Sequence, residues 1–129
     1  MQATGLPVRF IATVAHIITW VTILFDLSEA SSKGGISTQD LEGLSYSAVV
    51  LMVVEVGLLM SGLTTFLSGL AAWQTLFHAV GTGLVAGWIE GGWNQSSLVS
   101  FFVFFNILPF LLECGSAYYM YKNHLTRYR

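Results

Sequence analysis

Four long runs of apolar residues follow one another along the chain, and short polar segments separate them. The runs cover residues 8–27, 44–66, 71–89 and 98–121. Each run is close to the roughly 20 apolar residues that an α-helix needs to cross a membrane. None of them alternates as a membrane strand does, and a helix pairs its own backbone groups within lipid. The pattern therefore predicts an all-α integral membrane protein, with four transmembrane helices in an antiparallel bundle that forms a single domain over residues 1–129.

The polar segments predict where the chain leaves the membrane. Residues 28–43 hold four charged side chains among glycines and serines, which is typical of a polar loop. Trp88 and Trp93 flank the connection between the third and fourth runs, where aromatic rings anchor a helix at the membrane surface. An alternative for the first run is a signal peptide, because Ser-Glu-Ala at 28–30 resembles a cleavage site. Arg9, at the start of that run, is the one basic side chain of the amino-terminal segment, and this favours a retained helix.

The composition agrees with a protein whose outer surface faces lipid. Hydrophobic residues make up 54% of the 129 residues and charged residues only 9%, whereas a soluble domain has about a quarter of its residues charged. The net charge of −2 argues against nucleic-acid binding, which needs a basic face. A single cysteine, Cys114, excludes an internal disulfide and a multi-cysteine metal site.

Basic residues at the two ends of the apolar region predict its orientation. Arg9 lies at the very start of the first run, and Lys122, Arg127 and Arg129 follow the fourth. Lysine and arginine in short flanking segments mark the cytoplasmic side of a membrane protein. We therefore expect both termini on the cytoplasmic-type side, in agreement with an even number of spans.

Small residues recur at every fourth position in the second and third runs. This spacing keeps them on one face of each helix, where two backbones can approach closely. Because a short turn joins the two runs, the pattern predicts a tightly packed antiparallel hairpin, with a homodimer face as the alternative. The second-run stripe consists of Gly57, Ser61, Thr65 and Gly69, and the third-run stripe of Thr75, Ala79, Gly83, Gly87 and Gly91.

Four ionisable residues lie inside the apolar runs: His16, Glu55, His78 and Glu113. With a rise of about 1.5 Å per residue, all four fall in the middle or cytoplasmic half of their helices, at heights where they can meet. An unpaired charge within a bilayer costs several kcal/mol, so such groups face the interior of a bundle and pair. We interpret them as a structural polar cluster. The alternatives are a proton or ion relay, a His/Glu metal site and a bis-His haem site; the prediction is that the chain holds no metal or cofactor.

The fourth run contains a proline within its helix. Pro109 removes the N–H that would bond the Phe105 carbonyl, which predicts a kink. Asn106 lies about one turn earlier and is placed to satisfy backbone groups that the proline frees. Glu113 follows Pro109 by four residues, so both should face the interior, and we expect Glu113 to reach His16, His78 or Glu55, directly or through water.

Several segments together resemble the transmembrane protein 107 family. They are GLPVRFIATVAHIITWVTILF, VVEVGLLMSGLTTFLSG, FHAVGTGL and FVFFNILPFLLE, in that order over most of the chain. His16, Glu55, His78, Pro109 and Glu113 match positions of the family pattern. The tail after the fourth run and the composition of the 28–43 segment differ from that pattern. The resemblance implies a four-span, non-enzymatic component of the ciliary transition zone, which helps recruit other members and controls which membrane proteins enter the cilium.

Three functional hypotheses follow for the whole chain. The first is a transition-zone scaffold whose partners are the lipid bilayer and other membrane proteins. The second is an accessory subunit of a large membrane assembly, such as an energy-transducing complex of the mitochondrial inner membrane. The third is a redox or transport protein that uses the His/Glu cluster. The sequence contains no catalytic triad pattern, phosphate-binding glycine loop or nucleotide fingerprint, so we do not expect an enzyme.

Overall fold

The computed structural model describes residues 2–64, 67–91 and 93–123, and among them it is helical without a strand. The first half of the chain forms the long helix α1 (Gln2–Phe25), the short helix α2 (Leu27–Gly34) and the long helix α3 (Thr38–Met60). After α4 (Ser68–Gly91) come α5 (Gln95–Phe102), the π-helical turn η1 (Val103–Ile107) and α6 (Leu108–Lys122), which form one continuous helix. The all-α class predicted from the sequence is confirmed.

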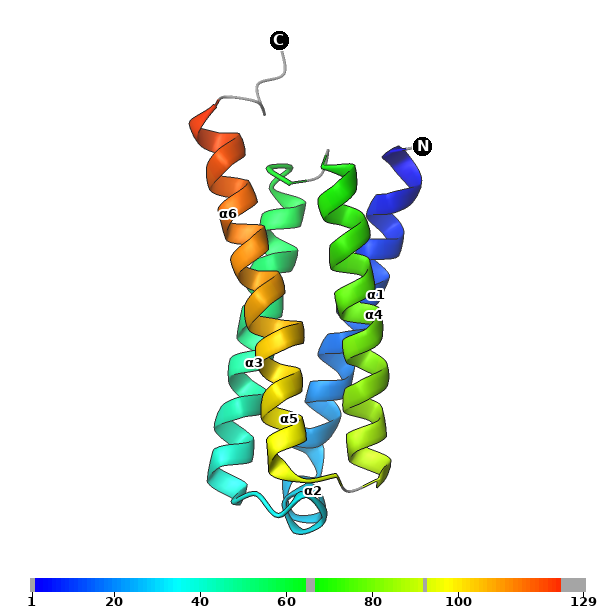
Figure 1. Ribbon diagram of the computed structural model, residues 1–129, viewed down its shortest axis with the longest axis vertical. Helices are drawn as coiled ribbons and strands as arrows, with labels where there is room; N and C mark the ends of the chain where they lie inside the picture. The colour runs from blue at the N-terminus through cyan, green and yellow to red at the C-terminus, as the bar shows by residue number, and fades with distance from the viewer. Residues whose placement is uncertain (1, 65–66, 92, 124–129) are drawn as a thin grey trace.

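The long helices lie side by side along the longest axis of the molecule (Figure 1). Helix α1 packs along α4 and also contacts α3, while α6 lies against α3 and α5 against α4. The beginning of α1 and the end of α6 are found at the same end of the molecule, and α2 lies at the opposite end. This arrangement brings the first helix into contact with helices that follow much later in the sequence.

Among the described residues, three helices are long and apolar enough to cross a membrane. They span Pro7–Phe25, Thr38–Met60 and Gln95–Lys122. Helix α4 has 24 residues, but it includes Gln74 and His78, whose side chains are buried inside the molecule. Its more polar composition therefore comes in part from the face that it turns toward the other helices.

The apolar core lies in the half of the molecule nearer α2 and is built around two tryptophans. Trp20 and Trp88 are buried together with smaller side chains of α3 and α5. Trp88 was predicted to anchor the chain at the membrane surface, but it is 1% exposed and its indole N–H donates to the Asn94 carbonyl at 3.1 Å. Trp93, in contrast, is 43% exposed and covers Gly87. The core consists of Trp20, Ile23, Ile36, Leu41, Ala48, Met52, Val85, Trp88 and Leu98.

The predicted polar loop over residues 28–43 is wrong in part, because it contains helix α2 and the beginning of α3. Asp26 caps α2 by accepting from the Glu29 backbone N–H, and Gly35 ends it in the left-handed conformation with φ of 65°. Lys33 pairs with Glu29 one turn away, and this contact lowers the pKa of the Glu29 carboxyl and raises that of the Lys33 ammonium. Capping and i,i+4 pairing are thus enough to turn a polar segment into a short helix.

Helix α2 docks on the core through a glycine. A Cβ on Gly34 would lie 2.2 Å from the ring of Trp88, so the helix backbone can rest on that ring only because the side chain is absent. Three residues after the end of α2, Ser37 caps α3 by accepting from the Asp40 backbone N–H. The second long helix therefore begins at Thr38, earlier than the apolar run indicated.

The structure does not form the close-packed hairpin predicted from the small-residue stripes. Helix α4 packs closely along α1, and far less of it approaches α3. The space around the Cβ positions of Gly57, Gly69 and Gly83 is open within 4 Å, and Ser61 and Ala79 are exposed. The stripes therefore lie largely on the outside, while side chains such as His78 and Glu55 fill the space between α3 and α4.

The remaining stripe positions are distributed differently. Gly87 and Gly91 lie under Trp93, whose ring would be 3.1 Å and 2.7 Å from an added Cβ. Thr75 donates its hydroxyl to the Ala71 carbonyl within its own helix. Thr65 lies outside the described residues.

The proline in the fourth apolar run is accommodated by the π-helical turn η1. The Leu108 N–H bonds the Val103 carbonyl, five residues back instead of four. A wider turn separates the ring of Pro109 from the carbonyl with which it would clash in a regular α-helix. Asn106 lies in this turn and is buried, but within the described residues its amide forms no hydrogen bond. The prediction that Asn106 satisfies freed backbone groups is therefore wrong.

Candidate functional site

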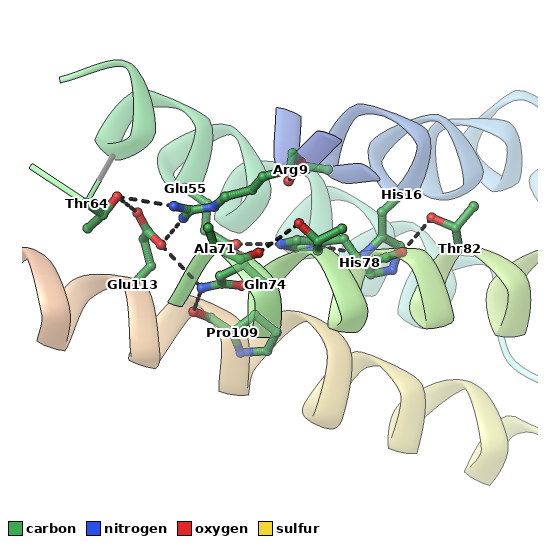
Figure 2. A network of polar contacts seen from close by, with 12 residues as sticks. Arg9, His16, Glu55, Thr64, Ala71, Gln74, His78, Thr82, Pro109 and Glu113 are labelled. Carbon is green, nitrogen blue, oxygen red and sulfur yellow. Dashed lines mark hydrogen bonds and ion pairs between the residues drawn. The ribbon is translucent and has the colours of Figure 1, made fainter. Parts of the chain in front are cut away.

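Two polar networks lie in the interior of the helices, and Figure 2 shows most of their side chains. We call the first the arginine network; its members are Arg9, Thr64, Gln74 and Glu113. We call the second the histidine network, and it consists of Trp20, His16, His78 and Glu55. Every one of these side chains is buried.

The arginine network is centred on an ion pair between the first and last helices. Arg9 of α1 donates through Nη2 to Glu113 of α6, and Arg9 and Glu113 are 3% and 0% exposed at their side chains. The hydroxyl of Thr64 donates to the other carboxylate oxygen of Glu113. A charge-assisted contact of this kind in a buried site holds both partners firmly, because neither can return to water without cost.

Gln74 links this ion pair to the proline of α6. Its Nε2 donates to the Pro109 carbonyl at 2.8 Å and to Oε2 of Glu113 at 3.3 Å. Because Gln74 belongs to α4, the arginine network ties together α1, α4, α6 and the segment after α3 that carries Thr64. Polar contacts thus connect α1, α4 and α6 at one level of the molecule.

The histidine network is a chain of hydrogen bonds across α1, α4 and α3. Nε1 of Trp20 donates to Nε2 of His16 at 3.3 Å. Nδ1 of His16 lies 3.0 Å from Nδ1 of His78, and Nε2 of His78 lies 2.8 Å from Oε2 of Glu55. The two imidazole rings are tilted by 59° with centroids 5.3 Å apart. Side chains that are far apart in sequence therefore meet end to end.

Glycine at one position makes room for this chain. A Cβ on Gly81 of α4 would lie 2.6 Å from Cε1 of His16 and 3.0 Å from Cβ of Phe105. The absence of a side chain at Gly81 lets α1 and η1 approach α4 at the level of the histidines. The sequence pattern of small residues did not single out Gly81, because it lies between the positions of the predicted stripe.

The structure brings three of the four predicted cluster residues into one chain and places the fourth elsewhere. His16, His78 and Glu55 contact one another, whereas Glu113 contacts Arg9. The expectation of a direct contact from Glu113 to a histidine or to Glu55 is therefore wrong, although its side chain does face the interior as predicted. Its countercharge was missed because a basic residue just before an apolar run normally lies at the membrane surface.

Some buried polar atoms of this interior have no hydrogen-bond partner among the described residues. They include one oxygen each of Glu55 and Gln74 and both amide atoms of Asn106. Most buried polar groups in proteins are hydrogen-bonded, so atoms of this kind require a specific explanation. The part of the chain that the structure describes contains no group of three or more His, Cys, Asp and Glu side chains that could hold a metal ion.

Long apolar helices with charged and polar side chains turned inward define the class of this protein, which is a helical integral membrane protein. A family model described as TMEM107, transmembrane protein, matches residues 6–117. The chain therefore belongs to the transmembrane protein 107 family, as the resemblance of its motifs indicated. Comparisons with curated proteins and with solved structures gave no match.

Proposed function

We propose that this chain crosses the membrane four times, as an antiparallel bundle with both ends on the cytoplasmic side. Three described helices have the length and apolarity of membrane spans. Helix α4 is the fourth, and its polar side chains Gln74 and His78 are tolerated because they bond to groups of neighbouring helices. The beginning of α1 and the end of α6 lie at the same end of the molecule, which supports an even number of crossings.

Within that topology, the function we propose is that of a non-enzymatic scaffold in the membrane of the ciliary transition zone. The observation that carries this proposal is the family match over residues 6–117, which includes both polar networks. A scaffold of this kind recruits other membrane proteins and controls which of them pass into the ciliary membrane.

The chemistry of the bundle supports a structural role for its polar groups. The Arg9–Glu113 pair and the contacts of Gln74 and Thr64 connect helices to one another. Outward-facing side chains such as Phe25, Met60 and Tyr121 are large and apolar or aromatic, and they suit lipid and the helices of other membrane proteins. The contacts that specify a helical arrangement are thus inside, and the surface is left for membrane partners.

Localisation in ciliated cells tests this function. We expect a fluorescently tagged chain to concentrate at the base of the cilium, between the basal body and the axoneme, and its depletion to change the set of membrane proteins found in the cilium. Gly83→Ala should localise normally because the space at that Cβ is open, whereas Glu113→Leu should be lost from the site because it leaves Arg9 unpaired. A wild-type chain found in mitochondria, or cilia of unchanged composition after depletion, would contradict the proposal.

A further inference from the structure

The hydrogen-bonding groups of the histidine network fix where its protons lie. The indole N–H of Trp20 can only donate, so Nε2 of His16, 3.3 Å away, must accept and carries no proton. The proton of His16 is therefore on Nδ1, from which it donates to Nδ1 of His78 at 3.0 Å. That bond in turn places the proton of His78 on Nε2, where it donates to Glu55 at 2.8 Å.

This direction of donation makes both imidazoles neutral. A cationic His78 would have an N–H at each ring nitrogen, so His16 would have to accept at Nδ1. The proton of a neutral His16 would then be on Nε2 and would point at the N–H of Trp20. Two donors facing each other at this distance would repel. Neither His16 nor His78 therefore supplies a positive charge to Glu55.

The other cation of this interior already has a partner. Arg9 contacts Glu113 through Nη2 and lies 3.5 Å from Thr64 through Nη1. Both Arg9 and Glu113 are close enough to Glu55 for their charges to act on it, but as a pair they largely cancel. The thiol of Cys114 on α6 is also close enough to Glu55 for the charge of the carboxylate to act on it. The charged and titratable groups around Glu55 thus leave its carboxyl without a countercharge of its own.

One oxygen of that carboxyl lacks a hydrogen bond altogether. Glu55 is 2% exposed, and its Oε1 is buried without a partner among the described residues. Moving an isolated ionised carboxylate out of water is so costly that such a group takes up a proton instead. Acceptors are still open in the same interior, because Oε1 of Gln74, one turn before His78, and Oδ1 of Asn106 are likewise unpaired among the described residues.

We propose that Glu55 is a buried proton-binding site that is occupied at neutral pH. Its Oε2 accepts from His78, and Oε1 carries the proton and donates it to an open oxygen acceptor, directly or through a water molecule. The four side chains then form a hydrogen-bond chain without net charge that starts at Trp20 and continues past Glu55. Loss of this one proton would place a negative charge between α3 and α4, next to the hydrogen bonds that connect α1, α3 and α4.

Infrared spectroscopy of the purified full chain in phosphatidylcholine nanodiscs tests this site at neutral pH. We expect a carboxylic-acid C=O band that shifts in D2O and is absent from Glu55→Gln. Glu42→Gln is the matched control, because Glu42 belongs to the same helix but is exposed, and it should keep the band. Glu55→Gln should also keep the thermal stability of the wild type, since an amide accepts and donates at the same two positions, whereas Glu55→Leu should lose stability.

Two further measurements keep the test decisive. If Glu55→Gln does not fold, Glu55→Asp should shift the band, because aspartic and glutamic acid side chains absorb at different frequencies. Nitrogen-15 NMR of the wild-type chain, with the signals of His16 and His78 assigned by comparison with a variant of each, should show both rings neutral, with the proton on Nδ1 of His16 and on Nε2 of His78. A wild-type spectrum without the band, a band that survives in both Glu55 variants unchanged, or a cationic His16 or His78 at neutral pH would overturn the proposal.

Discussion

Gly81 is the residue of α4 that leaves room for the His16 ring of α1, and its effect can be separated from that of a neighbouring glycine. Gly81→Ala should lower the free energy of unfolding by about 1–3 kcal/mol, because its Cβ would lie 2.6 Å from the His16 ring. Gly83→Ala is the matched control on the same helix, since the space at that Cβ is open. Thermal unfolding of both variants in detergent measures the difference. Equal stability of the two variants would show that α1 and α4 are not packed at this level as described.

The buried pair between Arg9 and Glu113 makes a second residue-level prediction. Arg9→Met or Glu113→Leu alone should destabilise the bundle by about 3–5 kcal/mol, because each leaves an unpaired charge in the interior. The double variant should recover much of this loss, because no charge is then left buried. A double-mutant cycle of thermal or chemical unfolding measures the coupling. If the effects of the two single variants simply add, the two side chains do not pair.

Residue type alone accounts for part of the interior. His16, Glu55 and His78 could be assigned to one cluster because an ionisable side chain inside an apolar helix needs a partner at the same depth. Arg9 could not, because basic residues near the end of a span normally reach the membrane surface. The choice between partners for Glu113 depended on how the helices rotate about their axes, and apolar runs as uniform as these do not specify that rotation.

At the scale of elements, α2 depends on one contact between a glycine and a tryptophan. Gly34→Ala should displace α2 from the core, because the added Cβ would lie 2.2 Å from the Trp88 ring. Gly43→Ala in α3 should be tolerated, since nothing lies within 4 Å of its Cβ. Amide hydrogen exchange is expected to accelerate across α2 in the first variant and to remain unchanged in the second. Protection of α2 that is the same in both variants would contradict this docking.

The elements themselves were predictable where long apolar runs specify them. The runs identified α1, α3, α4 and the continuous α5–α6 helix because hydrophobic length determines whether a segment can span a membrane. Helix α2 was missed because a polar eight-residue helix has no apolar run, and its caps were the available signal. The helix contacts were predicted incorrectly because regularly spaced small residues face lipid as well as other helices.

For the molecule as a whole, the four-span topology that we propose predicts which residues can be labelled from each side of a membrane. In a Cys114→Ser background, we expect Ser32→Cys and Gln95→Cys to react with an impermeant maleimide from one side, and Asn123→Cys from the other. All three positions are exposed, so a lack of reaction is due to the membrane. Gln95→Cys tests α4 directly: if α4 does not cross, Gln95→Cys is labelled from the side opposite Ser32→Cys.

The Arg9–Glu113 pair also has a consequence for how the protein is made. The two residues are separated by 104 positions, and a ribosome delivers the amino-terminal helix first. Arg9 therefore enters the membrane long before its countercharge has been synthesised, and the cost of an unpaired charge in lipid remains until the last helix arrives. Nascent chains that stop before α6 should be recognised by membrane quality control and degraded. Completion of translation, rather than insertion of any single helix, is then the event that releases a stable protein.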